Sequence, residues 1–174
     1  MSPSEISKNL SNTFEIYLSS LPSYTHEAFD FKKEEDIWSL GQMYEHLYTS
    51  GIYFFLANIN RCLEKRKGTL DAAPNKSGFF VLKNNEIPEG KYERPDTGRN
   101  PEPVSRGIQF YEKNLPQLLT EFLKKEDLVS NDSGEYRTEH PYFGFLNARE
   151  WYQSMEIHLR HHLRQKAELE SYID

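Results

Sequence analysis

The segment EIHLRHHLRQ, from Glu156 to Gln165, carries the pattern on which the fold and the chemistry of this chain depend. Its first and third histidines, His158 and His162, stand four residues apart, so on an α-helix they lie one above the other. The helical stripe through them is otherwise mostly apolar, and it reads Trp151, Met155, His158, His162, Gln165, Leu169 and Tyr172. Buried imidazoles need polar partners. A divalent metal ion is a suitable common partner for two of them.

The whole chain has the composition of a single cytoplasmic domain. Its 174 residues fit one domain over 1–174, and its net charge of −6 argues against a protein that grips nucleic acid. One cysteine, Cys62, excludes an internal disulfide and fits a reducing cytosol. We find no signal-peptide pattern, and the longest apolar run, Gly51 to Ala57, is too short to span a bilayer. Neither nucleic acid nor a membrane is therefore expected as a partner.

Helical periodicity predicts two helices in the first part of the chain. The first covers about Pro3 to Leu21, where apolar residues recur at helical spacing. The second begins at Ser39, because Ser39 and Gln42 have the spacing of a capping box, and it runs to about Lys65.

Two further helices are expected in the second half. The third covers about Glu102 to Lys125, and Pro116 should kink it or split it in two. The fourth opens at Asn147, whose side chain can cap with Glu150 reaching back, and it continues to about Tyr172. The fold class predicted is all-α: a four-helix bundle, in which any site lies between facing helices.

A long, mostly irregular connection separates the second and third predicted helices. Residues 66–103 contain five prolines and lose the periodicity, with one brief extended piece expected around Phe79 to Leu82. Loops of this length in a compact domain are usually functional or mobile. The basic residues of this connection can serve an anionic cosubstrate, although a solvated loop of mixed charge is the better interpretation. They are Lys76, Lys83, Lys91, Arg94 and Arg99.

The second predicted helix has a histidine of its own. His46 lies on a stripe with Met43, Ser50 and Tyr53, and bundles direct ligands from facing helices toward a common interior point. Three neutral imidazoles form the ligand set of open catalytic zinc sites. Imidazole also suits nickel, copper and iron, so the ligand type alone does not settle the metal. An ordinary pair of surface histidines remains the alternative that the residues alone leave open.

Two stretches of the chain resemble the DinB-like superfamily. WSLGQMYEHL, from Trp38 to Leu47, resembles the helix-two signature of that superfamily, and HPYFGFLNAREW with HLRHHLRQ, within His140 to Gln165, resembles the last helix of one of its branches. The first and third helices match only in kind and spacing. The resemblance implies a DinB-like four-helix bundle, frequent homodimers and a site for zinc or nickel. The implied ligands are His46, His158 and His162.

The same resemblance implies a class of chemistry. Characterised relatives include transferases and isomerases that use low-molecular-weight thiols such as bacillithiol, mycothiol or glutathione. By this likeness, the metal would activate a thiol or water for attack on a small electrophile, as in a thiol S-transferase or a hydrolase. A non-catalytic binding protein, dimeric and stabilised by metal or by a metal-free histidine network, is the alternative.

Several polar residues near the ligands have two interpretations each. His161 lies about 60° round the helix from His158, so it can replace that ligand or face a dimer partner, but a partly exposed polar histidine is favoured. Gln42 and Gln165 each lie one turn from a ligand and can hold an imidazole in its working tautomer. For Gln42 the capping role is the stronger interpretation, and for Gln165 the two are even.

Other side chains are expected to be structural. Glu45 points about 100° away from its neighbour His46 and should be solvated, and Tyr53 is expected in the core. His140 should make a hydrogen bond in a turn, and Cys62 should be a buried small residue. A fourth ligand such as His140 or Glu156 would close the site and indicate a structural metal. The paired Glu-x-x-His motifs of di-iron bundles and the His-Glu-x-x-His motif of metalloproteases are absent.

Overall fold

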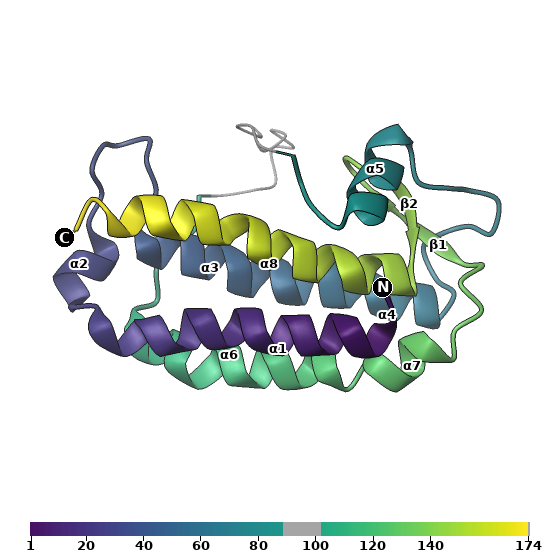
Figure 1. The fold of residues 1–174 in the computed structure, drawn as a ribbon, viewed down its shortest axis with the longest axis horizontal. Helices are drawn as coiled ribbons and strands as arrows, with labels where there is room; N and C mark the ends of the chain where they lie inside the picture. Colours follow the sequence, from purple (N-terminus) through teal and green to yellow (C-terminus); the bar gives the residue numbers. More distant parts are fainter. Residues whose placement is uncertain (89–101, 174) are drawn as a thin grey trace.

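The computed structural model describes residues 1–88 and 102–173, and the chain is predominantly α-helical. Four long helical segments run side by side along the molecule (Figure 1): α1 (Pro3–Ser20), α3 (Leu40–Ser50) with its continuation α4 (Ala57–Leu63), α6 (Ile108–Leu123) and α8 (Ala148–Glu170). Both α1 and α3 pack against α6 and α8. Two short helices, α2 (His26–Asp30) and α7 (Glu126–Ser130), were not predicted. No helix among the described residues is long and apolar enough to cross a membrane.

The starts predicted for the two histidine-bearing helices are confirmed. Ser39 Oγ accepts a hydrogen bond from the Gln42 N–H at 3.1 Å, and Gln42 Oε1 accepts one from the Ser39 N–H at 3.0 Å. Asn147 and Glu150 make the same reciprocal pair at the start of α8, with both bonds at 2.9 Å. These side chains satisfy N–H groups that a helix leaves unpaired at its first turn. These caps, which the sequence predicts, fix the residue at which each helix begins. The side of the helix on which each histidine lies follows from its spacing from that start.

The helix that starts as α3 passes through a π-helical turn, Gly51–Leu56, before it continues as α4. A π turn contains more residues than an α turn, so the inward stripe shifts by one position from Tyr53 to Phe54. The Phe54 ring contacts the Trp151 ring edge to face, with centroids 5.0 Å apart, whereas Tyr53 is 74% exposed. The prediction that Tyr53 belongs to the core is wrong for this reason.

The third long helix starts later than predicted. Gly107 has a φ of 80°, a backbone conformation that favours glycine, and α6 begins only at Ile108 rather than at Glu102. The helix continues through Pro116, so it is not split there.

The described part of the long connection contains a helix instead of an extended piece. Asn75 caps α5 (Lys76–Asn84) by accepting a hydrogen bond from the Gly78 N–H at 2.9 Å, so the extended piece predicted around Phe79 to Leu82 is wrong. Lys76 and Lys83 lie on α5. The other basic residues of the predicted connection, Lys91, Arg94 and Arg99, lie outside the described residues.

A small antiparallel sheet lies beside α5 at the same end of the molecule (Figure 1). It consists of β1 (Arg137–His140) and β2 (Gly144–Asn147), with Arg137 opposite Asn147 and His140 opposite Gly144. The all-α prediction is therefore correct for the long elements and wrong for this hairpin. Strands of four residues give too short an alternation to be recognised in the sequence.

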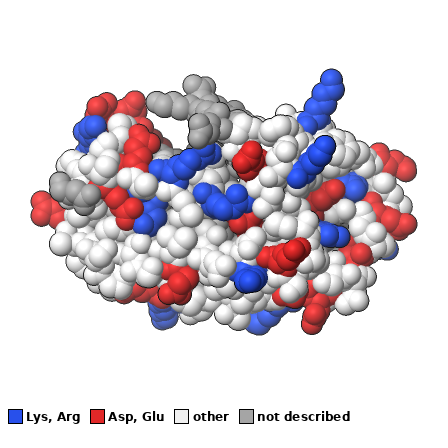
Figure 2. Space-filling model, in the orientation of Figure 1, with Lys and Arg blue, Asp and Glu red and all other residues white. Residues whose placement is uncertain are grey.

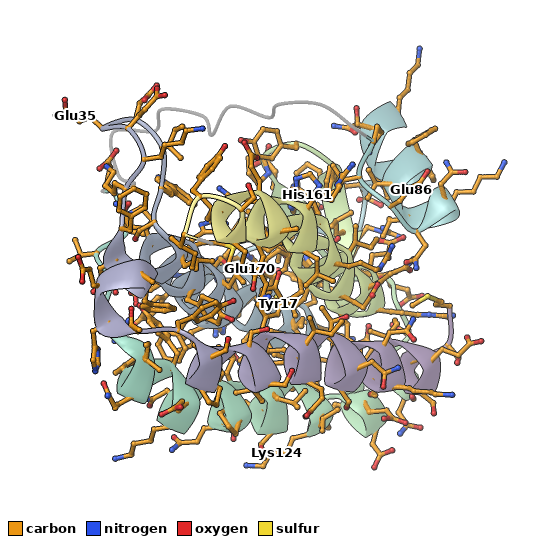
Figure 3. All side chains as sticks on the ribbon, turned by 60° about the vertical axis from the view of Figure 1, so that its left-hand side comes forward. Tyr17, Glu35, Glu86, Lys124, His161 and Glu170 are labelled. Atoms are coloured by element: carbon orange, nitrogen blue, oxygen red, sulfur yellow. The ribbon has the colours of Figure 1, made fainter. Side chains whose placement is uncertain are left out.

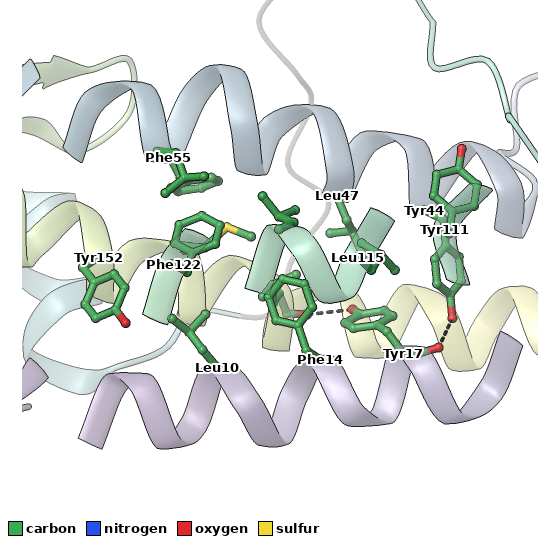
Figure 4. Packing of buried hydrophobic residues seen from close by; sticks show 14 of the residues in the cluster. Leu10, Phe14, Tyr17, Tyr44, Leu47, Phe55, Tyr111, Leu115, Phe122 and Tyr152 are labelled. Atoms are coloured by element: carbon green, nitrogen blue, oxygen red, sulfur yellow. Dashed lines mark hydrogen bonds between the residues drawn. The ribbon is translucent and has the colours of Figure 1, made fainter. Parts of the chain in front are cut away.

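The core between the long helices is rich in aromatic residues (Figure 4). Its buried tyrosines keep their hydroxyl groups bonded: Tyr17 Oη donates to the Leu159 carbonyl and Tyr44 Oη donates to the Tyr17 carbonyl, both at 2.8 Å. Tyrosine rings supply large apolar area, and their hydroxyls avoid the cost of unpaired burial. This core connects α1 to α3 and α8 and holds the two histidine-bearing helices against each other.

Candidate metal centre

Three histidines converge from the two helices that the caps position. His46 comes from α3, and His158 and His162 come from successive turns of α8. One ring nitrogen from each lies within 4.8 Å of the other two, and the ring centroids are 4.6 to 5.1 Å apart. Ligands at about 2.0–2.1 Å around a tetrahedral zinc ion are roughly 3.3 Å from one another. Small side-chain rotations can therefore bring all three predicted ligands onto one ion.

Aromatic rings flank this triad. The Trp38 ring lies 5.3 Å from the His46 ring, and the Phe55 ring lies 5.0 Å from the His158 ring, measured between centroids. One hydroxyl group is also close, because Ser50 Oγ lies 3.5 Å from His158 Nε2. The three imidazoles are thus partly buried between α3 and α8, with mostly apolar surroundings.

Burial keeps the two triad imidazoles of α8 neutral. Desolvation, together with the nearby His162 and His46, holds the pKa of His158 well below its usual range. Burial lowers the pKa of His162 to about 4, although its hydrogen bond with Gln165 acts in the opposite direction. A neutral imidazole has a lone pair ready for a metal, with no proton to displace. At neutral pH His158 and His162 are therefore in the protonation state that metal binding needs.

Gln165 lies where a tautomer-setting residue would lie. Its Oε1 is 2.8 Å from His162 Nδ1, and an amide oxygen can only accept, so the proton of this imidazole is on Nδ1. The lone pair of His162 is then on Nε2. Gln42, in contrast, uses its amide oxygen in the α3 cap and donates from Nε2 to the Pro103 carbonyl at 3.0 Å. Its capping role is confirmed.

His161 does not belong to the group of three. It lies on the side of α8 that faces away from α1 (Figure 3), and its ring centroid is 5.5 Å from that of His162. Its Nδ1 lies 2.9 Å from Arg164 Nη2. Partial burial and the charge of Arg164 lower its pKa. It is therefore a half-buried polar histidine next to the triad.

The two residues considered as a closing fourth ligand are bound elsewhere. His140 Nδ1 accepts hydrogen bonds from the Tyr142 and Phe143 N–H groups, each at 3.2 Å, as the predicted structural role requires. The buried Glu156 carboxylate binds Arg160 with both oxygens, at 2.9 and 3.0 Å. In the part of the chain that the structure describes, no carboxylate, thiol or fourth imidazole joins the triad. The protein thus supplies three ligands there.

Glu45, expected in solvent, is buried. Its carboxylate forms a two-point ion pair with Arg106, at 2.6 and 2.9 Å, and accepts a hydrogen bond from Tyr111 Oη at 2.9 Å. The Arg106 guanidinium also lies 4.1 Å from the centroid of the Phe110 ring. The prediction is wrong because these partners are more than sixty residues away in the chain. The cluster ties α3, one residue before His46, to the segment that leads into α6.

The remaining candidates lie apart from the triad. Cys62 is fully buried, with Sγ 3.4 Å from Thr138 Oγ1, and burial raises the pKa of its thiol. This confirms it as a buried structural residue. His26 is exposed on α2, and its Nε2 lies 3.1 Å from Gln109 Nε2.

Comparisons with family models, curated proteins and solved structures give no match to this chain. The convergence of His46, His158 and His162 is therefore the feature of this structure that indicates a function.

Proposed function

We propose that this chain is a DinB-like four-helix bundle that binds one divalent metal ion, zinc or nickel, through His46, His158 and His162. The observation that carries the proposal is the approach of three ring nitrogens, from two helices, to within 4.8 Å of one another. The donor set fits such an ion, because zinc and nickel both accept imidazole nitrogen. Burial supports it further, since it keeps the imidazoles of His158 and His162 neutral.

Three protein ligands favour a reactive metal over a purely structural one. Structural zinc sites are generally closed by four protein ligands, whereas catalytic sites keep a position open. A bound ion at such a position would lower the pKa of a thiol or water and so favour attack on a small electrophile. The likeness to thiol-dependent transferases favours a low-molecular-weight thiol as cosubstrate and a homodimer as the assembly.

The surrounding side chains would support this role without taking part in bond formation. Trp38 and Phe55 lie against two of the ligand rings and limit the access of water to them. Gln165 holds the proton of His162 on Nδ1 and thereby fixes the ring orientation.

Elemental analysis of protein purified without a histidine tag tests metal binding. We expect close to one equivalent of a transition metal in the wild type, or its uptake when zinc or nickel is added. The variant His158→Ala with His162→Ala should bind none. His26→Ala is the matched control, because it removes an exposed histidine outside the triad. A wild type that takes up no metal would remove the proposal.

A second experiment separates an enzyme from a non-catalytic binding protein. Metal-loaded protein is incubated with a thiol and a panel of small electrophiles, and the loss of free thiol is followed. We expect consumption that disappears in the triad variant and persists in His26→Ala. Metal binding without consumption of the thiol with any electrophile in the panel would favour the non-catalytic alternative.

A further inference from the structure

The short helix α5 presents two phenylalanine rings to solvent. Phe79 is 58% exposed and Phe80 is 47% exposed, whereas Gly78 and Val81 are buried against the rest of the molecule. The helix lies outside the group of four long helices, next to the hairpin and the start of α8 (Figure 1). Leaving a phenylalanine side chain in water forgoes about 1.5–3 kcal/mol of burial free energy. Folding of this chain alone gives no reason to place two such rings side by side in solvent.

Two lysines lie on the same side of α5 as these rings. Lys76 precedes Phe80 by four residues and Lys83 follows Phe79 by four, and residues at this spacing are neighbours on a helix. Both lysines are exposed, and neither forms an ion pair with a carboxylate among the residues that the structure describes. Long basic side chains project from the molecule at the end where α5 lies (Figure 2). The outer side of α5 therefore combines apolar rings with positive charge.

A hollow of about 340 Å³ lies beside Phe79, between α5 and the first turns of α8. On the α5 side it is lined by Phe79, Leu82 and Lys83. On the α8 side it is lined by Arg149, Glu150 and Gln153, among others. Binding pockets range from about 300 to 1,000 Å³, so a hollow of this size suits one apolar side chain better than a large ligand.

The charges around the hollow leave it positive. The Glu150 carboxylate is already paired with Arg137 at 2.5 Å. The Arg149 guanidinium, in contrast, donates to the carbonyl of Met1, which is a neutral group. Lys83 adds a second positive charge at the opposite wall. A carboxylate placed at the mouth of the hollow would therefore be attracted from both walls.

Hydrogen bonds fix the two walls relative to each other. Gln153 Nε2 donates to the Leu82 carbonyl and to Asn85 Oδ1, both at 3.0 Å. Arg160 Nη2 donates to the Asn85 carbonyl at 2.6 Å. These bonds hold the C-terminal end of α5 on α8, so the hollow exists before anything binds. Binding to a preformed surface avoids the cost of ordering it.

We propose that α5 and this hollow form a docking site for an acidic segment of a partner protein. An apolar side chain of that segment occupies the hollow against Phe79 and Leu82, and carboxylates beside it pair with Lys83 and Arg149. The net charge of the chain is −6, so a basic surface on it favours an acidic partner over other proteins. A membrane fits less well, because two rings are a small apolar anchor and a flat bilayer does not enter a hollow between helices.

Selection from a random peptide library displayed on phage, with the whole chain as bait, tests the chemistry of the partner. We expect the enriched peptides to combine an apolar or aromatic residue with several aspartates or glutamates. Enrichment of neutral or basic peptides, or of none, would overturn the proposal.

Fluorescence polarisation with an enriched peptide then tests the place of binding. Phe79→Ser, and Lys83→Glu with Arg149→Glu, should each weaken binding about tenfold or more, as the loss of an apolar or a charged anchor does. Leu128→Ser with Lys8→Glu is the matched control, because it changes an exposed apolar and a basic residue on α7 and α1. Raising the salt from about 0.05 M to about 0.5 M should also weaken binding. Affinities that do not respond to the α5 and α8 variants would overturn the proposal.

Two further measurements separate this site from the alternatives. The variant His158→Ala with His162→Ala should bind the peptide as the wild type does, so the docking site stands or falls independently of the metal site. Sedimentation with vesicles of phosphatidylserine and phosphatidylcholine should show no binding. Vesicle binding that is lost in Phe79→Ser would overturn the proposal in favour of a membrane surface.

Discussion

The hairpin end of the molecule and the middle of α8 both bury histidine, but different groups satisfy the rings. At the hairpin, His140 Nδ1 accepts two backbone hydrogen bonds, and its ring stacks on Phe143 with centroids 4.2 Å apart. In the triad, His46, His158 and His162 face one another with centroids at most 5.1 Å apart. Backbone N–H groups satisfy the ring of His140, whereas in the triad one ring nitrogen from each of three histidines lies close to the other two.

A lowered pKa alone does not distinguish a structural histidine from a binding one in this protein. Burial lowers the pKa of His140 to about 3 and that of His162 to about 4, so the titration behaviour of the two rings is similar. Only the identity of the partner atoms separates them. A ring whose lone pair accepts backbone N–H groups is structural, and lone pairs that converge from two helices form a binding site.

Metal binding should produce the largest difference in unfolding free energy between variants of the two sites. A ligand at a thousand times its Kd stabilises a folded protein by about 4 kcal/mol. We expect zinc to raise the free energy of unfolding of wild type and of a folded His140→Asn variant to a similar extent, as measured by urea unfolding with and without metal. The variant His158→Ala with His162→Ala should gain nothing. Equal stabilisation of all three proteins would place the metal elsewhere.

In the metal-free protein, removal of the His140 ring should cost more stability than removal of the His162 ring. His140→Ala leaves two backbone N–H groups without an acceptor, and a buried unsatisfied group costs about 1–3 kcal/mol. His162→Ala removes a desolvated ring from beside two others, and we expect a loss of about 1 kcal/mol or less. Urea unfolding after chelation measures both, and a larger loss for His162→Ala would contradict the distinction.

The sequence predicted the triad well because local rules position it. Ser39 and Asn147 start the two helices by caps that lie within three residues of their partners. Helical spacing then places His46 on α3 and His158 with His162 on α8. The only long-range step was the packing of α3 against α8, which the apolar stripes imply.

The predictions that failed concern features that local sequence rules do not determine. Glu45 was expected in solvent because its partners, Arg106 and Tyr111, come from a distant segment. Tyr53 was expected in the core because no sequence signal marked the π-helical turn at Gly51–Leu56. The hairpin was missed because its strands are short and are held in part by the packing of β2 against α8. Tertiary contacts, rather than local preference, decide the burial of Glu45 and the position of the hairpin.

Gln42 and Gln165, which each lie one helical turn from a triad histidine, give a finer test of the difference between a structural role and a role at the metal site. Loss of a side chain that orients a metal ligand typically lowers metal affinity by about 10- to 100-fold, so Gln165→Leu should weaken zinc binding in that range. Gln42→Leu should lower stability by about 1 kcal/mol through the cap and leave zinc affinity within about threefold. Competition with a chromophoric chelator measures both affinities. Equal affinities in the two variants would show that Gln165 does not act on the ligand.

The smallest predicted effect is a loss of stability at acid pH. Burial lowers the pKa of a histidine at each site, and a variant can isolate the contribution of His140. Unfolded His140 titrates near its usual pKa of 6.5, but in the folded protein it titrates near 3. Between these values the unfolded state binds more protons. The contribution of His140 to stability is therefore complete above pH 6.5, and it is lost as the pH falls toward 3.

Replacing His140 with asparagine keeps an acceptor for the turn and removes this titration. Between pH 6.5 and 5.5 the chelator-treated wild type should lose about 1 kcal/mol more of its unfolding free energy than His140→Asn does. Urea unfolding at a series of pH values measures the difference in slope, which does not depend on how much the substitution destabilises the protein at neutral pH. Because the triad histidines are present in both proteins, their own titration cancels. Parallel slopes would mean that His140 titrates normally when folded, and the backbone-bound ring would then not be the buried, neutral counterpart of the triad.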